Sequence, residues 1–258
     1  MSELGGQAYL DSLGENERRR LKETGAEMVK LAQKHSAAII IAPPPSQQGR
    51  LQSASGCVLL LEGTHYLVTA AHVLAGFESR RATDKSVTWQ VGDLVLNPLD
   101  RVAWRDDERD VLMLSLRATE AAMIPVAVAS VSDGWPPPHP AADDFVLVSG
   151  YPAADRWRHD AKRLTFNALS AIFRVTTSGG YHLVCQWERE FFVSFEGPGV
   201  PPKGRELGGM SGAPVFRIGR LTYPLVGVVS EFQNDFELMR VSTLHPAPSP
   251  DGFTNRAR

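Results

Sequence analysis

The spacing of hydrophobic positions changes once along the chain, near residue 36. From residue 15 to about 34, Leu21, Gly25, Met28 and Ala32 recur at intervals of three and four. This spacing places them on one face of an α-helix. We therefore predict a helical N-terminal extension over residues 1–36 that packs its narrow apolar face on the rest of the protein. The alternative interpretation is a docking or autoinhibitory element that binds a regulatory protein partner.

Beyond this extension, short runs of Val, Leu, Ile, Thr and aromatic residues alternate with turn-forming residues. The run CVLLLEGTHYLVTAA predicts two strands joined by a tight turn at residues 62–65. Further strand-like runs are SVTWQV, DVLMLSL, DFVLVSGY, RLTFNALSAIFRVTT, YHLVCQW, FFVSF, APVFRIG and LTYPLVGVVSEF. Many short strands with little helix between them indicate an all-β barrel or sandwich protein.

Proline and polar residues divide these strands into two groups. Residues 131–143 are proline-rich and cannot form a central strand, so we predict a linker there. The first β unit then spans residues 37–130 and the second spans residues 144–243. The polar, proline-containing segment 244–258 is predicted to be a flexible tail.

Composition and charge exclude several classes of function. The 258 residues carry a formal net charge of -2, which gives no reason to expect nucleic acid or an anionic membrane as a partner. No apolar run approaches the roughly 20 residues of a membrane span, and the N-terminus lacks the apolar stretch of a signal peptide. With only two cysteines, these features predict a cytoplasmic protein. No His, Cys or carboxylate cluster has metal-ligand spacing, so we predict no metal and no cofactor.

The segment ELGGMSGAPVF, residues 206–216, surrounds Ser211 with glycines. Without a Cβ, glycine lets backbone N–H groups converge on a small oxygen. The amides of Gly209 and Ser211 could form such a pair, as an oxyanion hole does. A simple glycine-rich hairpin is the other interpretation of this segment.

A serine nucleophile needs a base and a group that orients the base. His72 follows a strand-like run in LVTAAHVL, whereas the other six histidines lie in loops, at a helix end, on a predicted turn or at a strand start. Asp110 directly precedes the apolar run VLMLSL, while Asp106, Asp107 and Glu108 lie further out. We therefore predict that Asp110 orients His72 and that the other three acidic residues form a solvated loop.

These motifs together resemble those of trypsin-like serine proteases of the chymotrypsin fold, especially the bacterial stand-alone intracellular type. TAAHV, DVLML and GGMSGAP match the histidine, aspartate and serine motifs in the family's order, and the resemblance covers about residues 37–243. It implies an all-β fold of two six-stranded antiparallel β-barrels with an extra N-terminal helix. The active site would lie between the barrels.

The resemblance also implies roles for individual residues. Ser211 would be the nucleophile, His72 the general base and then acid, and Asp110 its orienting group. The oxyanion hole would be formed by the amides of Gly209 and Ser211. Substrate-binding residues would be Ser230, Glu231 and Phe232 through their main chain, with Arg205 at the base of the primary specificity pocket. An exposed loop arginine is the other interpretation of Arg205.

Several positions depart from the family pattern. Cys57 stands at one of two cysteine positions that form a disulfide in many secreted members, but the second position is occupied by Val73. Met210 stands where many members have an aspartate that binds a newly cleaved N-terminus. Together with the lack of an IVGG-like start, this predicts an enzyme that is not activated by N-terminal cleavage and insertion.

The sequence therefore predicts a serine endopeptidase that acts on polypeptide substrates through an acyl-enzyme. Two alternatives stay open: a protease fold used only to bind a partner, and a latent protease whose oxyanion loop forms when a partner binds.

Overall fold

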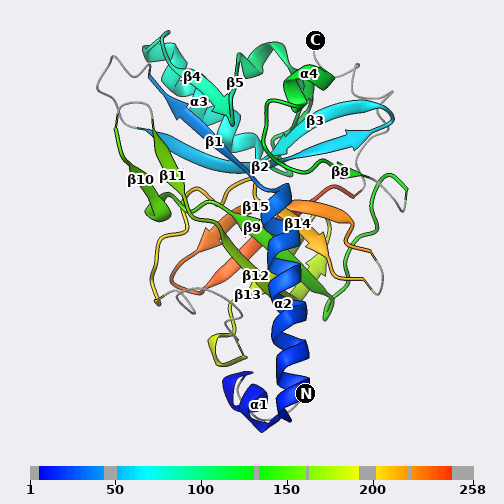
Figure 1. Ribbon diagram of the computed structural model, residues 1–258. Helices are drawn as coiled ribbons and strands as arrows, with labels where there is room; N and C mark the ends of the chain where they lie inside the picture. The colour runs from blue at the N-terminus through cyan, green and yellow to red at the C-terminus, as the bar shows by residue number, and fades with distance from the viewer. Residues whose placement is uncertain are drawn as a thin grey trace.

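Two β units stacked on each other form most of the protein (Figure 1). The computed structural model describes residues 6–43, 51–130, 134–160, 163–191, 202–219 and 222–245. The predicted all-β class with additional N-terminal helix is confirmed, and so is the arrangement in two mostly antiparallel β units.

The first unit is an open sheet in the order β5–β4–β1–β2–β3–β7–β6, with β8 parallel to β2. Strand β2 pairs with β1 through its first half and with β3 through its second half, changing partner between Gly56 and Cys57. The sheet therefore bends along β2 into a half-barrel. Its strands are β1 Ala37–Ala42, β2 Gln52–Leu61, β3 Thr64–Thr69, β4 Thr88–Val91, β5 Leu94–Leu96, β6 Val102–Asp106, β7 Val111–Leu116 and β8 Ala129–Ser130.

This half-barrel differs from the closed six-stranded barrel that the resemblance implied. Among the described residues, no pairing joins β5 to β6, so both remain edge strands. Closure needs every strand to continue the same register around the sheet. Here β2 divides its ten residues between two neighbours, which bends the sheet without closing it.

The second unit is a closed barrel of six strands in the order β12–β13–β16–β15–β14–β9. Its apolar interior is formed largely by alternate residues of its strands, such as Val146 and Val148 of β9 or Leu183 and Cys185 of β13, as in other small filled barrels. The strands are β9 Phe145–Gly150, β12 Leu169–Gly179, β13 His182–Gln186, β14 Pro214–Arg217, β15 Leu225–Gln233 and β16 Leu238–Thr243.

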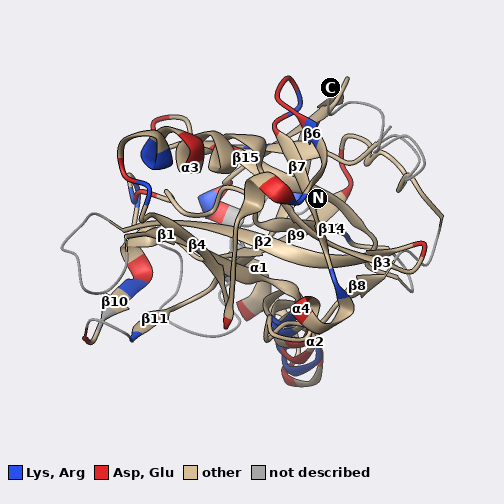
Figure 2. Cartoon of the chain, turned by 90° about the horizontal axis from the view of Figure 1, so that it is seen from above, with Lys and Arg blue, Asp and Glu red and all other residues tan. Residues whose placement is uncertain are grey.

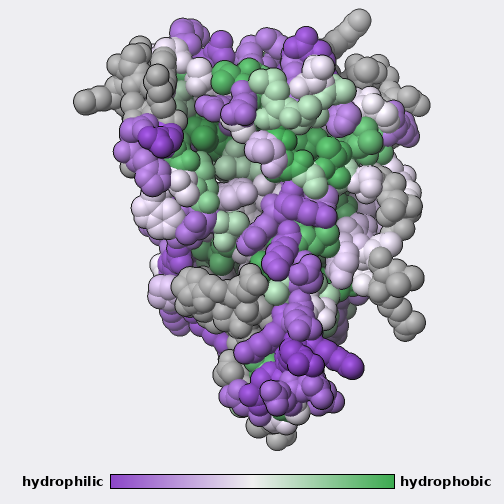
Figure 3. Space-filling view, viewed as in Figure 1, coloured by the Kyte–Doolittle hydropathy of each residue, from purple (hydrophilic) through white to green (hydrophobic). Residues whose placement is uncertain are grey.

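Helix α2, Glu15–His35, lies along the second barrel and ends at the junction of the two units (Figure 1). It contacts β9, β12 and β14, and its buried residues are Gly25 and Ala32. Gly25, Met28 and Ala32 of the predicted face therefore pack on the barrel, whereas Leu21, nearer the start of the helix, is 37% exposed. The outward face of the helix is hydrophilic (Figure 3). The Lys34 carbonyl accepts a 2.6 Å hydrogen bond from the Ala127 amide of the first unit. The Ser36 hydroxyl donates to the Ser149 carbonyl of β9 at 2.9 Å.

The remaining elements are short helices and one hairpin. They are α1 Gly6–Ser12, α3 Ala71–Thr83, α4 Ala118–Ala121, the 3-10 helices η1 Pro98–Asp100, η2 Ala153–Asp155 and η3 Arg189–Phe191, and the hairpin strands β10 Arg156–Arg158 and β11 Leu164–Phe166. No described helix is both long enough and apolar enough to span a bilayer. Basic and acidic residues are interspersed along α2, and α3 also carries residues of both signs (Figure 2).

One predicted strand is not found in the structure, and parts of two other predicted segments lie outside the described residues. The run FFVSF was predicted as a strand, but Phe191 ends a 3-10 helix, and residues 192–195 lie outside the described residues. The described part of the proline-rich segment, residues 134–143, forms no helix or strand. Residues 131–133 and most of the predicted tail, residues 246–258, lie outside the described residues.

Candidate functional site

His72 is held at the edge of the first unit by the transition from β3 to α3. Strand β3 ends at Thr69 and α3 begins at Ala71, so His72 is the second residue of the helix. Val73 and Leu74 are buried and anchor the helix on the sheet. The His72 side chain remains 49% exposed, which leaves the imidazole accessible from the space between the units.

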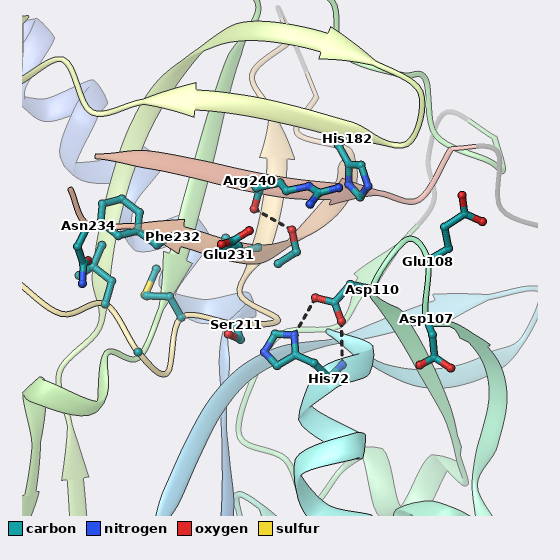
Figure 4. A pocket seen from close by; sticks show the side chains of 15 residues that line it. His72, Asp107, Glu108, Asp110, His182, Ser211, Glu231, Phe232, Asn234 and Arg240 are labelled. Atoms are coloured by element: carbon teal, nitrogen blue, oxygen red, sulfur yellow. Dashed lines mark hydrogen bonds and ion pairs between the residues drawn. The ribbon is translucent and has the colours of Figure 1, made fainter. Parts of the chain in front are cut away.

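Asp110 meets His72 because β3 and β7 are neighbours. The pairing of Thr69 with Leu112 places the end of β3 beside the start of β7, directly after Asp110. The Asp110 Oδ2 atom lies 2.7 Å from His72 Nδ1, and its Oδ1 atom accepts the His72 backbone N–H at 2.8 Å. Both carboxylate oxygens therefore hold the same residue, one through the imidazole and one through the main chain (Figure 4).

Ser211 lies in the turn before β14, on the opposite side of the imidazole from Asp110 (Figure 4). Gly209 and Gly212 on either side of it have φ angles of +98° and +83°, which favour glycine. A Cβ at Gly212 would come within 2.0 Å of the Thr69 side chain, and one at Gly209 within 2.6 Å of the Tyr151 carbonyl. The glycines are therefore required by conformation and by close packing, which a simple surface hairpin would not need.

The two amides predicted as an oxyanion hole make no hydrogen bond within the described part of the chain. The carbonyl of Gly208 accepts the Ala153 N–H at 2.6 Å, and the carbonyl of Met210 accepts the Ala213 N–H at 2.8 Å. In a trans peptide the N–H points opposite to the carbonyl. The N–H groups of Gly209 and Ser211 therefore point away from these partners and remain available to an incoming oxygen.

A cleft of about 560 Å³ contains these groups. Its lining includes His72, Asp110 and Ser211, together with charged residues of both units. Glu231 and Arg240 are paired across β15 and β16, and cross-strand partners project from the same face of a sheet. The cleft wall formed by the second barrel thus carries one carboxylate and one guanidinium (Figure 4).

The three residues predicted to bind substrate through their main chain, Ser230, Glu231 and Phe232, all line the cleft. They belong to β15, which pairs with β14 only over Leu225–Val228 and with β16 over a longer stretch. Beyond Val229, the edge of β15 that faces away from β16 makes no backbone hydrogen bond within the described residues. This short free edge can accept another strand.

Arg205, predicted at the base of the specificity pocket, is not brought together with the other site residues. Its guanidinium forms an ion pair with Asp155, and it does not line the cleft. The prediction assumed that the loop before Ser211 has the length usual in the family. In the structure, Asp155 neutralises the Arg205 charge, so this charge is not available to a substrate. Arg240 is the arginine that lines the cleft.

His182 lines the cleft as well, although its position at a strand start pointed to a structural role. Burial and the nearby Arg240 charge lower the pKa of His182, while the Asp110 charge raises it. The pairing of Val184 with Arg240 could not be read from the sequence. It places His182, two residues away, on the same face as Arg240.

Neither cysteine contributes to the site. Cys57 and Cys185 are free and buried, and burial raises the pKa of each thiol to about 12. Within the described ranges, no group of three His, Cys or carboxylate side chains could hold a metal ion.

No protein-family model and no curated protein matches the sequence. Among solved structures, the chain is similar to the serine protease domain of the Sesbania mosaic virus polyprotein, with 14% identity, a TM-score of 0.47 and coverage of 86% of this chain and 92% of that one. It is also similar to the Rv3671c protease from M. tuberculosis in its active form, at 19% identity, TM-score 0.45 and coverage of 84% and 78%. The serine protease of a human pathogenic astrovirus matches at 17% identity and TM-score 0.43, with coverage of 81% and 90%. At this level of similarity, the geometry of the cleft must support any proposal about function.

Proposed function

We propose that the protein is a serine endopeptidase in which Ser211, His72 and Asp110 act together. The observation that supports this most directly is the arrangement around Ser211. The imidazole lies on one side, with its Nδ1 atom bonded to Asp110 Oδ2 while Asp110 Oδ1 accepts the His72 backbone N–H. The amides of Gly209 and Ser211 make no competing hydrogen bond within the described residues. A base, an orienting carboxylate and free donors around one hydroxyl are the groups that acyl transfer needs.

In the proposed reaction, the Ser211 Oγ attacks the carbonyl carbon of the scissile peptide bond while His72 Nε2 takes its proton. Negative charge develops on the carbonyl oxygen, which the Gly209 and Ser211 amides stabilise. Collapse of this intermediate breaks the C–N bond, and the imidazolium gives its proton to the leaving amine. A water molecule then attacks the acyl-enzyme by the same steps, releasing the acid and restoring Ser211.

The free edge of β15 supports an extended polypeptide as the substrate. A peptide strand added along Ser230, Glu231 and Phe232 would form main-chain hydrogen bonds while its scissile carbonyl lies at Ser211. Because these bonds involve the backbone, they hold a peptide whatever its side chains are. Arg240 and Glu231 lie on the cleft wall, where substrate side chains would pass.

The same geometry supports an enzyme that needs no cleavage of its own N-terminus. Met210, directly before Ser211, is 5% exposed and belongs to the apolar core of the second barrel. A buried thioether cannot pair with an α-amino group, whereas the hydrogen bonds from Ala153 and Ala213 already orient the neighbouring peptides. The predicted cytoplasmic location and the bacterial subtype stay predictions.

Labelling with a fluorophosphonate tests the proposal. We expect the purified protein to be labelled without any added partner, with label lost in Ser211→Ala and strongly reduced in His72→Ala. Ser36→Ala, which changes a buried serine outside the cleft, is the matched control and should label like the natural protein.

The alternative functions are outcomes of the same experiment. Labelling that appears only after a cell extract is added would indicate the partner-activated protease. A protein that never reacts and never cleaves a peptide library would indicate a binding module. The first result would overturn the expectation that the protein is active without a partner, and the second would overturn the proposed function.

A further inference from the structure

Ser55 is a buried serine of β2 that reaches from the first unit to the Ser211 turn. It is 0% exposed, and its amide donates a 2.8 Å hydrogen bond to the Ser211 carbonyl. Its hydroxyl donates to the Gly209 carbonyl, also at 2.8 Å. We propose that Ser55 is a positioning residue that holds the oxyanion-binding amides in place. This inference rests on the proposed function.

The surroundings show why a side chain is needed at this point. Four successive carbonyls run through the turn, from Gly208 to Ser211. Those of Gly208 and Met210 are fixed by backbone N–H groups. The other two, at Gly209 and Ser211, are both held by Ser55. Among these four contacts, the Ser55 hydroxyl is the one that a substitution can remove without altering the main chain.

The Gly209 carbonyl is also the one most in need of a fixed partner. Gly209 has a φ angle of +98° and no side chain, so its backbone can rotate at little cost. Rotation there would turn the peptides on either side of it, and one of these carries the Gly209 N–H. The hydrogen bond from Ser55 opposes that rotation.

Ser55 also accepts hydrogen bonds from residues outside the Ser211 turn. Its hydroxyl accepts the Tyr151 N–H at 2.9 Å, so it is both donor and acceptor. Its carbonyl accepts the Thr69 hydroxyl at 2.7 Å. Thr69 ends β3 three residues before His72, and Tyr151 directly follows β9. Ser55 therefore connects the sheet that carries the base to the turn that carries the nucleophile.

The test compares Ser55→Ala with Ser36→Ala. Both replace a buried serine whose hydroxyl donates to a backbone carbonyl, but the Ser36 hydroxyl contacts the Ala32 and Ser149 carbonyls, away from the Ser211 turn. The measurements are kcat and KM on a peptide substrate, and inhibition by a peptide aldehyde, whose addition product places an oxygen where the oxyanion forms. Ser55→Cys, with a weaker donor, serves as a second variant.

For Ser55→Ala we expect kcat to fall about 10- to 100-fold with KM changed by less than about 2-fold, because a misplaced donor loses part of the effect of a missing one. The aldehyde should bind more weakly by the same factor. Ser55→Cys should lie between Ser55→Ala and the natural protein, and Ser36→Ala should match the natural protein.

Two results would overturn the inference: a kcat of both Ser55 variants equal to that of Ser36→Ala, or a rise in KM with kcat unchanged. The second would indicate a role in substrate binding or stability only. These failures are distinguishable from failure of the proposed function, which would show as a natural protein without Ser211-dependent activity.

Discussion

Replacing Asp110 by asparagine tests the most specific part of the site. Asparagine has nearly the same shape, and it tolerates the left-handed conformation that Asp110 adopts at φ +60°. Its side-chain oxygen can still accept the His72 backbone N–H, as Asp110 Oδ1 does at 2.8 Å. The change therefore acts at the 2.7 Å contact with His72 Nδ1, where a carboxylate oxygen becomes an amide NH₂.

Two effects follow from that exchange. The amide donates to Nδ1, so the proton of a neutral imidazole moves to Nε2, which can then no longer accept the Ser211 proton. The imidazolium also loses a negative charge 2.7 Å away. Coulomb's law gives about 1.5 kcal/mol for that charge pair in water and about 6 kcal/mol at the dielectric of a protein surface.

The exposure of the two groups decides between these limits. The Asp110 side chain is 22% exposed and the His72 side chain 49%, so solvent screens the pair considerably. A value of about 3 kcal/mol corresponds to roughly a 100-fold loss of rate. The unfavourable tautomer adds to this, and we expect kcat/KM to fall about 1,000-fold or more.

The assay is steady-state cleavage of a peptide, with thermal unfolding as a check on the fold. Asp106→Asn is the matched control, because it removes one charge from the same turn where Asp106 pairs with Arg109 instead of His72. The control should stay within a few fold of the natural protein. If Asp110→Asn loses less than about 10-fold while remaining folded, the orienting role of Asp110 is wrong.

Three further predictions concern stability and reactivity. Gly212→Ala should lower the free energy of unfolding by at least about 2 kcal/mol in urea titrations, because φ is +83° and a Cβ would lie 2.2 Å from a backbone carbonyl oxygen; an unchanged midpoint would contradict the turn geometry. Hydrogen bonds from the neighbouring Arg117 hold the pKa of buried Glu120 below its usual value. The ionised Glu120 side chain therefore contributes its full stabilisation above about pH 4.3, the usual pKa in an unfolded chain. This stabilisation is lost as the pH falls from there through the lower pKa of the folded state. Glu120→Gln should therefore flatten the acid side of the stability profile, and an unaltered profile would refute this. Cys57 and Cys185, with thiol pKa values of about 12, should resist iodoacetamide at pH 8 until the protein is unfolded, as mass spectrometry can check; rapid alkylation of the native protein would refute their burial.

The sequence was informative where local pattern decides structure. The apolar run and tight turn at 57–71 predicted β2 and β3, and the structure places the turn between Leu61 and Thr64. The position of His72 after β3 and of Asp110 before β7 followed from the same patterns. Their meeting depends on the pairing of these two strands, which the resemblance implied and local pattern could not show.

The sequence was less informative where distant pairing decides structure. Helix α3 was missed because AAHVL continues the apolar character of the preceding strand. The half-barrel was missed because the change of partner along β2 leaves no mark in its hydrophobic pattern. The ion pair between Arg205 and Asp155 joins residues 50 positions apart, so a loop arginine could not be assigned to the cleft or excluded from it.

The hydrogen bonds at the C-terminal end of α2 affect how the protein unfolds. Lys34 and Ser36, two residues from each other, are bonded to opposite halves of the protein through Ala127 and Ser149. Separating the halves would break at least one of these bonds and expose apolar residues shared across the junction, such as Leu59 and Leu147. Heating should therefore melt both halves in a single cooperative transition. Without the helix, we expect two transitions, the first of which separates the two halves at their junction.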